Sequence, residues 1–416
     1  MRALTAATIA AGLSGFVVLM IASRGLSGEE FAEFQAFWGL FFALAGVLDG
    51  LTQETTRSVA AARAVTAETG VEGNPGRPGA PWRLAGAAAA IAALGAALLG
   101  PLWAPLLLDD NRGTAVGLLA AGLGLYAYQA ALSGVLSGLG RWRRYAGLVA
   151  LDAALRVIAA LGGLAAGLGL VPFLIATVVG ALAWVVVLAA GETRGPLRVV
   201  CDVPLDRLAR RSGAAMLATG SSAAMITGFP VFIKATEDTA QEPLAAGLTV
   251  PAVLLAVSLT RAPILMPLQR LQSALVVWFV ERRRSPGRAL ALPVGATLAA
   301  GAVGAALAWL IGPWLLEVFF AQQSPGLVLA ALTFAGAFTG TLMITGCAAL
   351  AAERHSFYVG GWALSSAVGF GVLALPLPLD LGVCVALIAG PLSGMALHGV
   401  ALARMRPAPD AARPAA

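Results

Sequence analysis

The sequence contains few of the residues that build metal centres, disulfide frameworks or soluble surfaces. Its three cysteines, Cys201, Cys347 and Cys384, lie far apart and form no paired or metal-binding motif. Only two histidines, His355 and His398, are present, and charged residues make up 12% of the chain, against about a quarter in a typical soluble domain. We therefore expect no metal and no cofactor, and no soluble enzyme fold.

Apolar residues dominate what is there. Of the 416 residues 59% are hydrophobic and 50 are glycine, and the mean hydropathy is +0.85. Nearly every segment between charge clusters is ~20 apolar residues long, enough to cross ~30 Å of hydrocarbon as a helix. These segments do not alternate polar and apolar residues as the strands of a membrane barrel do. The expected fold class is all-α, a polytopic membrane protein.

The hydropathy pattern predicts twelve transmembrane helices. They cover residues 4–23, 34–56, 84–108, 114–138, 145–167, 170–190, 213–233, 244–280, 289–312, 326–350, 356–376 and 382–403. The first could pass for a signal peptide, but its long apolar part and the spans that follow favour an uncleaved helix. The eighth would be ~55 Å long as one helix, so it must protrude from the bilayer or bend.

Arginines gather in alternate loops. One set of loops carries Arg63, Arg77, Arg83, Arg141, Arg143, Arg144, Arg194, Arg198, Arg207, Arg210, Arg211, Arg282, Arg283, Arg284, Arg288, Arg354, Arg404, Arg406 and Arg413. The opposite set is mainly acidic. Because positive loops stay in the cytoplasm, we expect a bacterial inner-membrane protein with both termini cytoplasmic. The net charge of +6 then belongs to cytoplasmic loops, and no nucleic-acid partner is expected.

The two halves of the chain match at an offset of about 210 residues. "LGPLW" at 99–103 is followed in the second half by "IGPWL" at 311–315, and Tyr145 in a basic turn corresponds to Tyr358. Six spans per repeat is an even number, so the two lobes should be related by an axis along the membrane normal. The predicted organisation is an N-terminal lobe (1–190), a cytoplasmic linker (191–211), a C-terminal lobe (212–404) and a disordered tail (405–416).

Seven ionisable residues fall within or at the edge of the apolar segments: Asp49, Glu54, Arg57, Asp152, Arg156, Arg261 and Arg270. Such groups are costly in hydrocarbon and usually face a bundle interior or a water-filled cavity. Arg261 would lie ~20–25 Å along the eighth span, too deep to reach the headgroups easily. Its planar guanidinium suits a phosphate in a cavity.

Several of these charges allow two interpretations. Arg57 and Arg270 lie near the inner interface, where they could face the cavity or extend to lipid headgroups. Asp49, at the depth of Arg261, could pair with it or cap a kink, and Glu54 could pair with Arg57 or sit in water. Asp152 and Arg156 are four residues apart, hence on one helix face, either as a neutralising pair or as part of a cationic cavity.

Two stretches resemble polysaccharide flippases of the multidrug/oligosaccharidyl-lipid/polysaccharide exporter (MOP) superfamily. They are "IASRGLSGEEFAEFQAFWGLFFALAGVLDGLTQETTRSVA" (21–60), with an Arg ending the first helix, and "LSGVLSGLGRWRRYAGLVALDAALRVIAAL" (132–161), with an Arg inside the fifth helix. The resemblance implies two six-helix lobes around a V-shaped cationic cavity. It also implies translocation of polyprenyl-phosphate- or pyrophosphate-linked sugars to the outer leaflet, without covalent chemistry. The carboxylates of Asp49, Glu54 and Asp152 depart from a purely cationic cavity.

The sequence therefore predicts a lipid-linked saccharide flippase. The expected phosphate-binding residues are Arg24, Arg57, Arg156, Arg261 and Arg270, and the expected coupling or gating residues are Asp49, Glu54 and Asp152. Expected partners are the lipid-linked saccharide, membrane lipids and glycosyltransferases or a polymerase of the same pathway, with the protein itself a monomer.

Two other classes stay open. One is another secondary transporter, either major-facilitator-like or a drug exporter. The other is a membrane glycosyltransferase, for which Glu29, Glu30, Asp109 and Asp110 in external loops would be the candidate acids. The short external loops leave little room for an acceptor platform.

Overall fold

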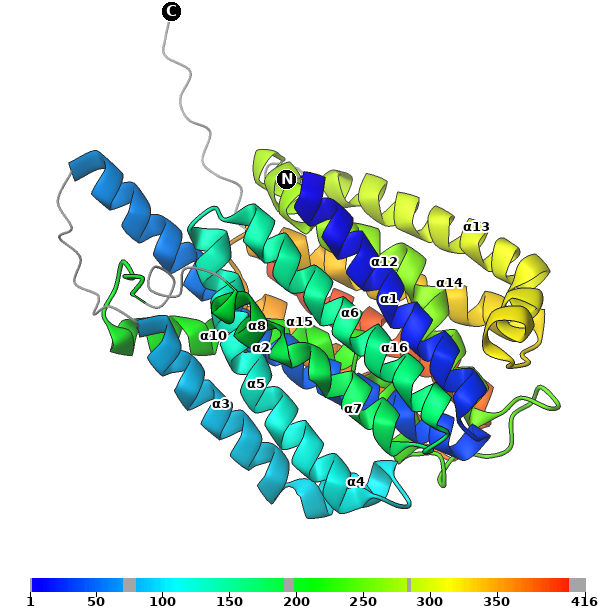
Figure 1. Ribbon diagram of the computed structural model, residues 1–416. Helices are drawn as coiled ribbons and strands as arrows, with labels where there is room; N and C mark the ends of the chain where they lie inside the picture. The colour runs from blue at the N-terminus through cyan, green and yellow to red at the C-terminus, as the bar shows by residue number, and fades with distance from the viewer. Residues whose placement is uncertain (1, 70–79, 191–197, 283–285, 404–416) are drawn as a thin grey trace, which may run out of the picture. The chain divides into compact units, whose positions relative to one another are not determined.

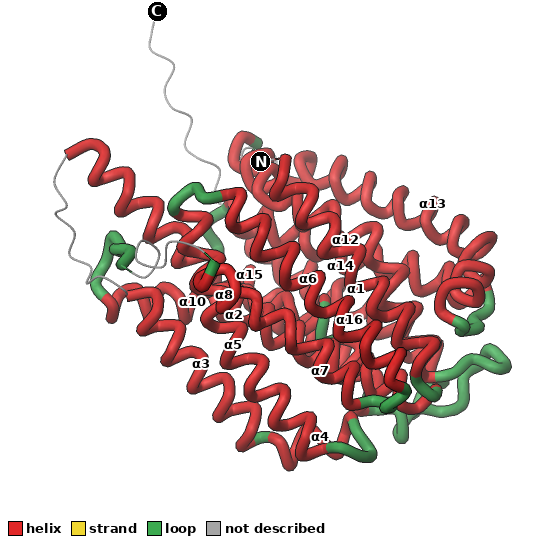
Figure 2. Tube along the Cα trace, viewed as in Figure 1, coloured by secondary structure: helices red, strands yellow, loops and turns green. Residues whose placement is uncertain are grey.

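The computed structural model describes residues 2–69, 80–190, 198–282 and 286–403. These residues form helices joined by short connections, and the one β-bridge among them pairs Gln241 with Pro378 (Figures 1 and 2). The predicted all-α membrane fold is confirmed. The predicted tail at 405–416 and part of the predicted linker, 191–197, lie outside the described residues.

The helices divide into two compact units. The first comprises Met1–Ala235 and Phe319–Ala321, and the second comprises Thr236–Val318 and Gln322–Ala416. The helices of the first are α1 (Arg2–Gly25), α2 (Gly28–Thr69), α3 (Ala80–Leu98), α4 (Gly100–Leu107), α5 (Arg112–Gly138), α6 (Trp142–Ala166), α7 (Val171–Val179), the 3-10 helix η1 (Gly180–Leu182), α8 (Ala183–Ala189), α10 (Leu205–Ile226) and α11 (Phe229–Ala235). Those of the second are α12 (Val250–Glu281), α13 (Pro286–Phe320), α14 (Gly326–Ala351), α15 (His355–Leu373) and α16 (Leu379–Ala403).

By length and composition ten of the described helical segments could cross a membrane, and the pair α10 and α11 would add an eleventh. The apolar stretch Ala10–Gly25 of α1 is shorter. Together these correspond to the twelve predicted spans. The chain is a multi-pass membrane protein.

Three predicted spans differ in detail from single straight helices. The segment predicted at 84–108 is broken, because Gly100 and Pro101 open a new helix, α4. The segment predicted at 213–233 bends by 56° between α10 and α11. The eighth span starts at Val250 rather than at 244, with Pro251 in its first turn, a position where a missing N–H costs nothing. It then runs through Pro263 and Pro267 as one helix.

Three of the helix pairs of the first unit have counterparts in the second. In the first unit α2 packs on α5, α5 on α7, and α6 on α7. In the second unit α12 packs on α14, α14 on α16, and α15 on α16. These are equivalent spans of the two predicted repeats, so the repeated packing agrees with the internal duplication seen in the sequence.

The seventh span packs within the first unit, where α10 and α11 lie against α2. A side chain at Gly50 of α2 would overlap the backbone at Met216 of α10, and one at Gly220 would meet Val47 at 2.9 Å. Glycine therefore allows the two helices to approach backbone to backbone. The boundary between the compact units falls after Ala235, whereas the division into lobes at 191–211 stays a prediction.

Candidate functional site

A partly buried polar cluster lies between α2, α5 and α6 in the first unit. It consists of Asp49, Tyr126, Gln129, Asp152 and Arg156. The Tyr126 hydroxyl donates a hydrogen bond to Asp49 Oδ1 at 2.8 Å, and Gln129 Nε2 donates to Asp152 Oδ1 at 3.0 Å. Tyr126 also interacts electrostatically with Asp152 and Arg156. The predicted charges of the second and fifth spans therefore belong to one electrostatic unit.

Arg156 is the most enclosed member of this cluster, with 3% of its surface exposed. Its Nε and Nη2 donate to the two carboxylate oxygens of Asp152, at 3.1 and 3.0 Å. This bidentate geometry is the strong form of an arginine–carboxylate pair. The predicted neutralising pair is present. The third nitrogen, Nη1, is buried with no hydrogen-bond partner among the described residues.

Aromatic rings of α2 surround the guanidinium of Arg156. Its central carbon lies 4.9 Å from the ring centre of Phe42, 5.3 Å from that of Phe41 and 5.9 Å from that of Trp38. Rings at these distances attract a cation through their π faces. On the other side Gly180 of η1 comes so close that a Cβ there would be 2.5 Å from Arg156 Nε. The rings and this glycine hold the charge in place.

A second ionic cluster, at the C-terminal part of α2, joins Glu54 and Arg57 to Asp202. Arg57 Nη2 lies 2.6 Å from Glu54 Oε1, and Arg57 Nη1 lies 3.0 Å from Asp202 Oδ2. The Ser58 hydroxyl donates to Asp202 Oδ1 at 2.6 Å. Of the two interpretations of Glu54, the structure shows the pair with Arg57. Two carboxylates neutralise Arg57, which weakens it as a free anion site.

The pKa of Asp202 responds to this arrangement. Burial raises the pKa of the carboxyl, but hydrogen bonds from Arg57 and Ser58 outweigh burial and hold the pKa below its ordinary value. Arg211 on α10 adds a longer contact, 3.9 Å from Asp202 Oδ2. Asp202 therefore stays ionised and ties the segment before α10 to α2.

Arg261 lies in the second unit, on α12, and is 3% exposed. Its Nε donates to the Val257 carbonyl at 3.1 Å. A Cβ at Gly336 of α14 would be 2.6 Å from Arg261 Cγ, so the stem of the arginine lies directly against that helix. The glycine makes room for a buried arginine at membrane depth. Its predicted phosphate-binding role stays a prediction.

The remaining predicted site residues are Arg24, Arg270 and Asp49. Arg24 is exposed at the end of α1. Arg270 belongs to α12, but its side chain lies outside the described part of the structure. The hydrogen bond that the structure shows for Asp49 goes to Tyr126 rather than to an arginine.

Sequence reasoning missed several members of these clusters. Tyr126 and Gln129 are three residues apart on α5, a spacing that places them on one helix face, and that spacing could have pointed to them. Trp38, Phe41 and Phe42 look like ordinary core aromatics. Asp202 carries no local signal, because its partner Arg57 lies 145 residues away.

Comparison with solved structures identifies the fold. The chain aligns with an inward-facing multidrug resistance MATE family transporter of the MOP superfamily, with a TM-score of 0.69 and 14% identity over 94% of both chains. It also aligns with a MOP superfamily transporter from Pyrococcus furiosus, with a TM-score of 0.65 and 14% identity over 97% of this chain and 94% of that one. The protein is a multi-pass membrane protein with a MATE-like fold.

Sequence relatives show the family. No protein-family model matches the chain. It is 38% identical over 402 residues to the uncharacterized protein Rv1510 of Mycobacterium tuberculosis, covering 96% of this chain and 90% of that protein. It is 37% identical over 402 residues to the uncharacterized protein Mb3654 of Mycobacterium bovis, with the same coverage. The chain belongs to the family of these mycobacterial proteins.

Proposed function

We propose that the protein is a flippase that moves polyprenyl-phosphate- or pyrophosphate-linked sugars from the inner to the outer leaflet. The membrane is the bacterial inner membrane, with both termini cytoplasmic. In this proposal the protein works as a monomer alongside the glycosyltransferases or polymerase of a cell-envelope pathway. The substrate crosses without covalent change.

The buried Nη1 of Arg156 carries this proposal. A guanidinium N–H group without a partner in a buried site costs free energy, and an oxyanion is the ligand whose geometry best satisfies it. Its position in the middle of α6 places it inside the bilayer, where an anionic headgroup would have to pass.

The carboxylates give this site a second property. With Asp49 and Asp152 ionised, the cluster formed with Arg156 has one net negative charge. A headgroup phosphate that takes the Nη1 contact would add more negative charge, so protonation of Asp49 would favour its binding. We propose Asp49 as the coupling carboxylate and Asp152 as the residue that orients Arg156. Arg261, in the second unit, would be a separate anion-binding arginine.

A solved structure of the same fold bears on the charge of the substrate. The Pyrococcus furiosus MOP transporter is described as having a binding pocket of reversed polarity, which suggests a different function for that protein. Pocket polarity thus varies within this fold, and in our proposal the buried arginines decide it for this chain.

The test is a flipping assay in proteoliposomes. A fluorescent polyprenyl-pyrophosphate sugar is placed in both leaflets, and a membrane-impermeant reductant then quenches the outer leaflet. Wild-type protein should make the whole pool accessible, whereas quenching that stops at half the pool contradicts the proposal. A new glycosidic product would instead indicate a glycosyltransferase.

The double variant Asp152→Asn with Arg156→Gln separates binding from simple charge neutralisation. It keeps the cluster neutral at these two positions and should fold, but it should lose flipping at least about tenfold, as expected for one lost charged contact of about 1.4 kcal/mol or more. If the pair only neutralises itself, the double variant will flip at the wild-type rate. Arg210→Ala, which removes an exposed pair with Asp206, is the control.

A further inference from the structure

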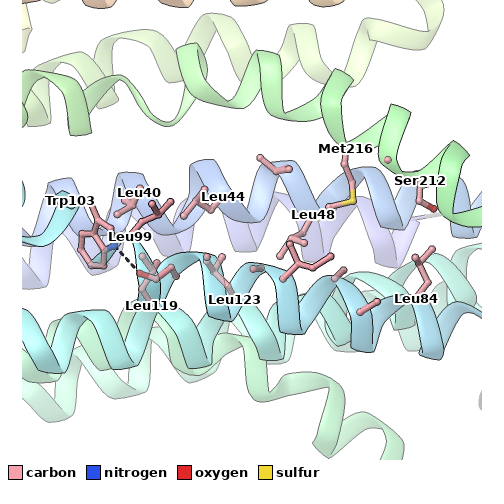
Figure 3. A pocket seen from close by; sticks show the side chains of 18 of the residues that line it. Leu40, Leu44, Leu48, Leu84, Leu99, Trp103, Leu119, Leu123, Ser212 and Met216 are labelled. Atoms are coloured by element: carbon pink, nitrogen blue, oxygen red, sulfur yellow. Dashed lines mark hydrogen bonds between the residues drawn. The ribbon is translucent and has the colours of Figure 1, made fainter. Parts of the chain in front are cut away.

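An apolar groove runs along one side of the first unit, between α2, α3 and α10 (Figure 3). Its volume is about 830 Å³, within the range of ligand pockets, ~300–1,000 Å³. Trp103 and Leu99 lie at one end, and Leu84, Met216 and Ser212 lie at the other (Figure 3). The groove is elongated along the helices rather than rounded.

The walls of the groove leave room for a chain. Along α3 the lining positions Ala88, Ala92 and Gly95 are small, and α10 contributes Ala209 and Gly213. A Cβ placed at Gly95 or at Gly213 would meet nothing within 4 Å, so both glycines open onto empty space. From Leu84 to Leu99 the lining follows ~22 Å of helix, a large part of the hydrocarbon core.

Ser212 interrupts this apolar lining, and its hydroxyl has no partner among the described residues. Ser212 is 1% exposed, and its hydroxyl oxygen makes no hydrogen bond within the part of the chain that the structure describes. A buried hydroxyl without a partner costs free energy. The Ser212 hydroxyl therefore points to an occupant that carries an oxygen at this end of the groove.

Positive charge lies at the same end. Arg211 precedes Ser212 on α10, and Arg83 precedes Leu84 on α3; both arginines are exposed. The remaining labelled lining of the groove is apolar (Figure 3). The occupant that fits is a long hydrocarbon chain with an anionic group at one end, in contrast to a zwitterionic lipid.

We propose that this groove holds the polyprenyl chain of the substrate lipid, with Ser212 donating a hydrogen bond to an oxygen of its phosphate. This inference rests on the proposed function and adds to it the path of the tail. The headgroup passes through the protein, while the chain stays on the membrane side of α2, α3 and α10.

Photocrosslinking tests the occupant directly. The probe is a polyprenyl phosphate with a diazirine in its chain, incorporated with the full-length protein in proteoliposomes. Peptide mapping should find the label on α3 and α10, at residues such as Ile91 and Met216. A parallel reaction uses phosphatidylethanolamine with a diazirine in an acyl chain. Equal labelling of the groove by that lipid, or no labelling by the polyprenyl probe, would overturn the inference.

Filling the groove tests its use. Gly95→Leu and Gly213→Leu project into the open space and should each reduce probe labelling and flipping about tenfold, as expected if a leucine displaces about two methylene groups of the chain. The matched control is Gly162→Leu on α6, where a Cβ also meets nothing within 4 Å and which does not line the groove. Ser212→Ala should reduce labelling by the phosphate probe but not lower the melting temperature.

The failures of the two proposals are distinguishable. If wild-type protein flips the sugar lipid and both leucine variants flip it equally fast, the groove inference is wrong and the flippase stands. If wild-type protein flips no sugar lipid, the proposed function fails, and with it the role of the groove in translocation.

Discussion

The side chains of Arg57 and Asp202 meet although 145 residues separate them in the chain, with Arg57 Nη1 3.0 Å from Asp202 Oδ2. The contact joins α2 to the segment that leads into α10. The strength of this contact depends on pH, because Asp202 must be ionised to form it.

Acidification should weaken this link. The pKa of Asp202 lies below its ordinary value in the folded protein, so the contact stabilises the fold fully above the unfolded pKa of about 3.9. That stabilisation is lost as the pH falls through the lower, folded value.

Asp202→Asn should lower the unfolding free energy by about 1–3 kcal/mol at pH 7 and flatten the stability profile below pH ~4. Thermal unfolding in detergent across this pH range measures both effects. Asp206→Asn, in an exposed pair, should change neither, and a pH profile identical to wild type in Asp202→Asn would contradict the assignment.

Removing Arg156 alone should destabilise the protein more than removing the whole pair. Arg156→Gln leaves the Asp152 carboxylate in a mostly buried site without its partner, which costs about 3–5 kcal/mol in comparable buried pairs. The double variant Asp152→Asn with Arg156→Gln should recover most of this loss. A double-mutant cycle on melting temperatures gives the coupling. Strictly additive effects would mean that the two side chains do not depend on each other.

Gly180 should not tolerate alanine. The added Cβ would lie 2.5 Å from both Arg156 Nε and Asp152 Oδ1, so the pair must move away from its bidentate geometry. We expect flipping to fall about tenfold or more, for a lost contact of about 1.4 kcal/mol, with a smaller effect on stability. Gly117→Ala is the control, because a Cβ on that glycine of α5 meets nothing within 4 Å. Wild-type flipping by Gly180→Ala would show that the geometry of the pair is not needed.

Arg261→Ala should abolish flipping while the protein still inserts and folds. Arg261 is a buried charge of α12, and its stem lies against Gly336; truncation removes the proposed anion contact. Expression and size-exclusion profiles should match wild type, and the flipping rate should fall at least about tenfold. Arg288→Ala, an exposed arginine of the same unit, provides the comparison. Flipping at the wild-type rate in Arg261→Ala would refute the role.

The sequence could predict the parts of this molecule that depend on local pattern. Hydropathy located the spans, because each helix must cover ~30 Å of hydrocarbon, and a four-residue spacing placed Asp152 beside Arg156. It could not show the break before Gly100 or the late start of α12 at Val250. Both depend on proline and glycine acting within a specific backbone path.

The sequence could predict some residues of the candidate sites but not the residues that they contact. The charged residues stand out in an apolar sequence, but their partners do not. Tyr126 meets Asp49 across 77 residues and Asp202 meets Arg57 across 145. Such contacts depend on which helix faces pack together, which a single sequence does not specify. The groove was missed for the same reason, because Ser212 is noticeable only once its hydroxyl is seen to lack a partner among the described residues.

The close approach of α2 and α10 has a practical consequence. At Gly50 the backbones touch without a side chain between them, so α10 has no room to slide or tilt on its own. It packs with α2 inside the first compact unit, whose boundary in the chain falls after Ala235. A spectroscopic label on an exposed position of α10 would therefore report the motion of the first unit, although hydropathy assigns that helix to the second half of the chain.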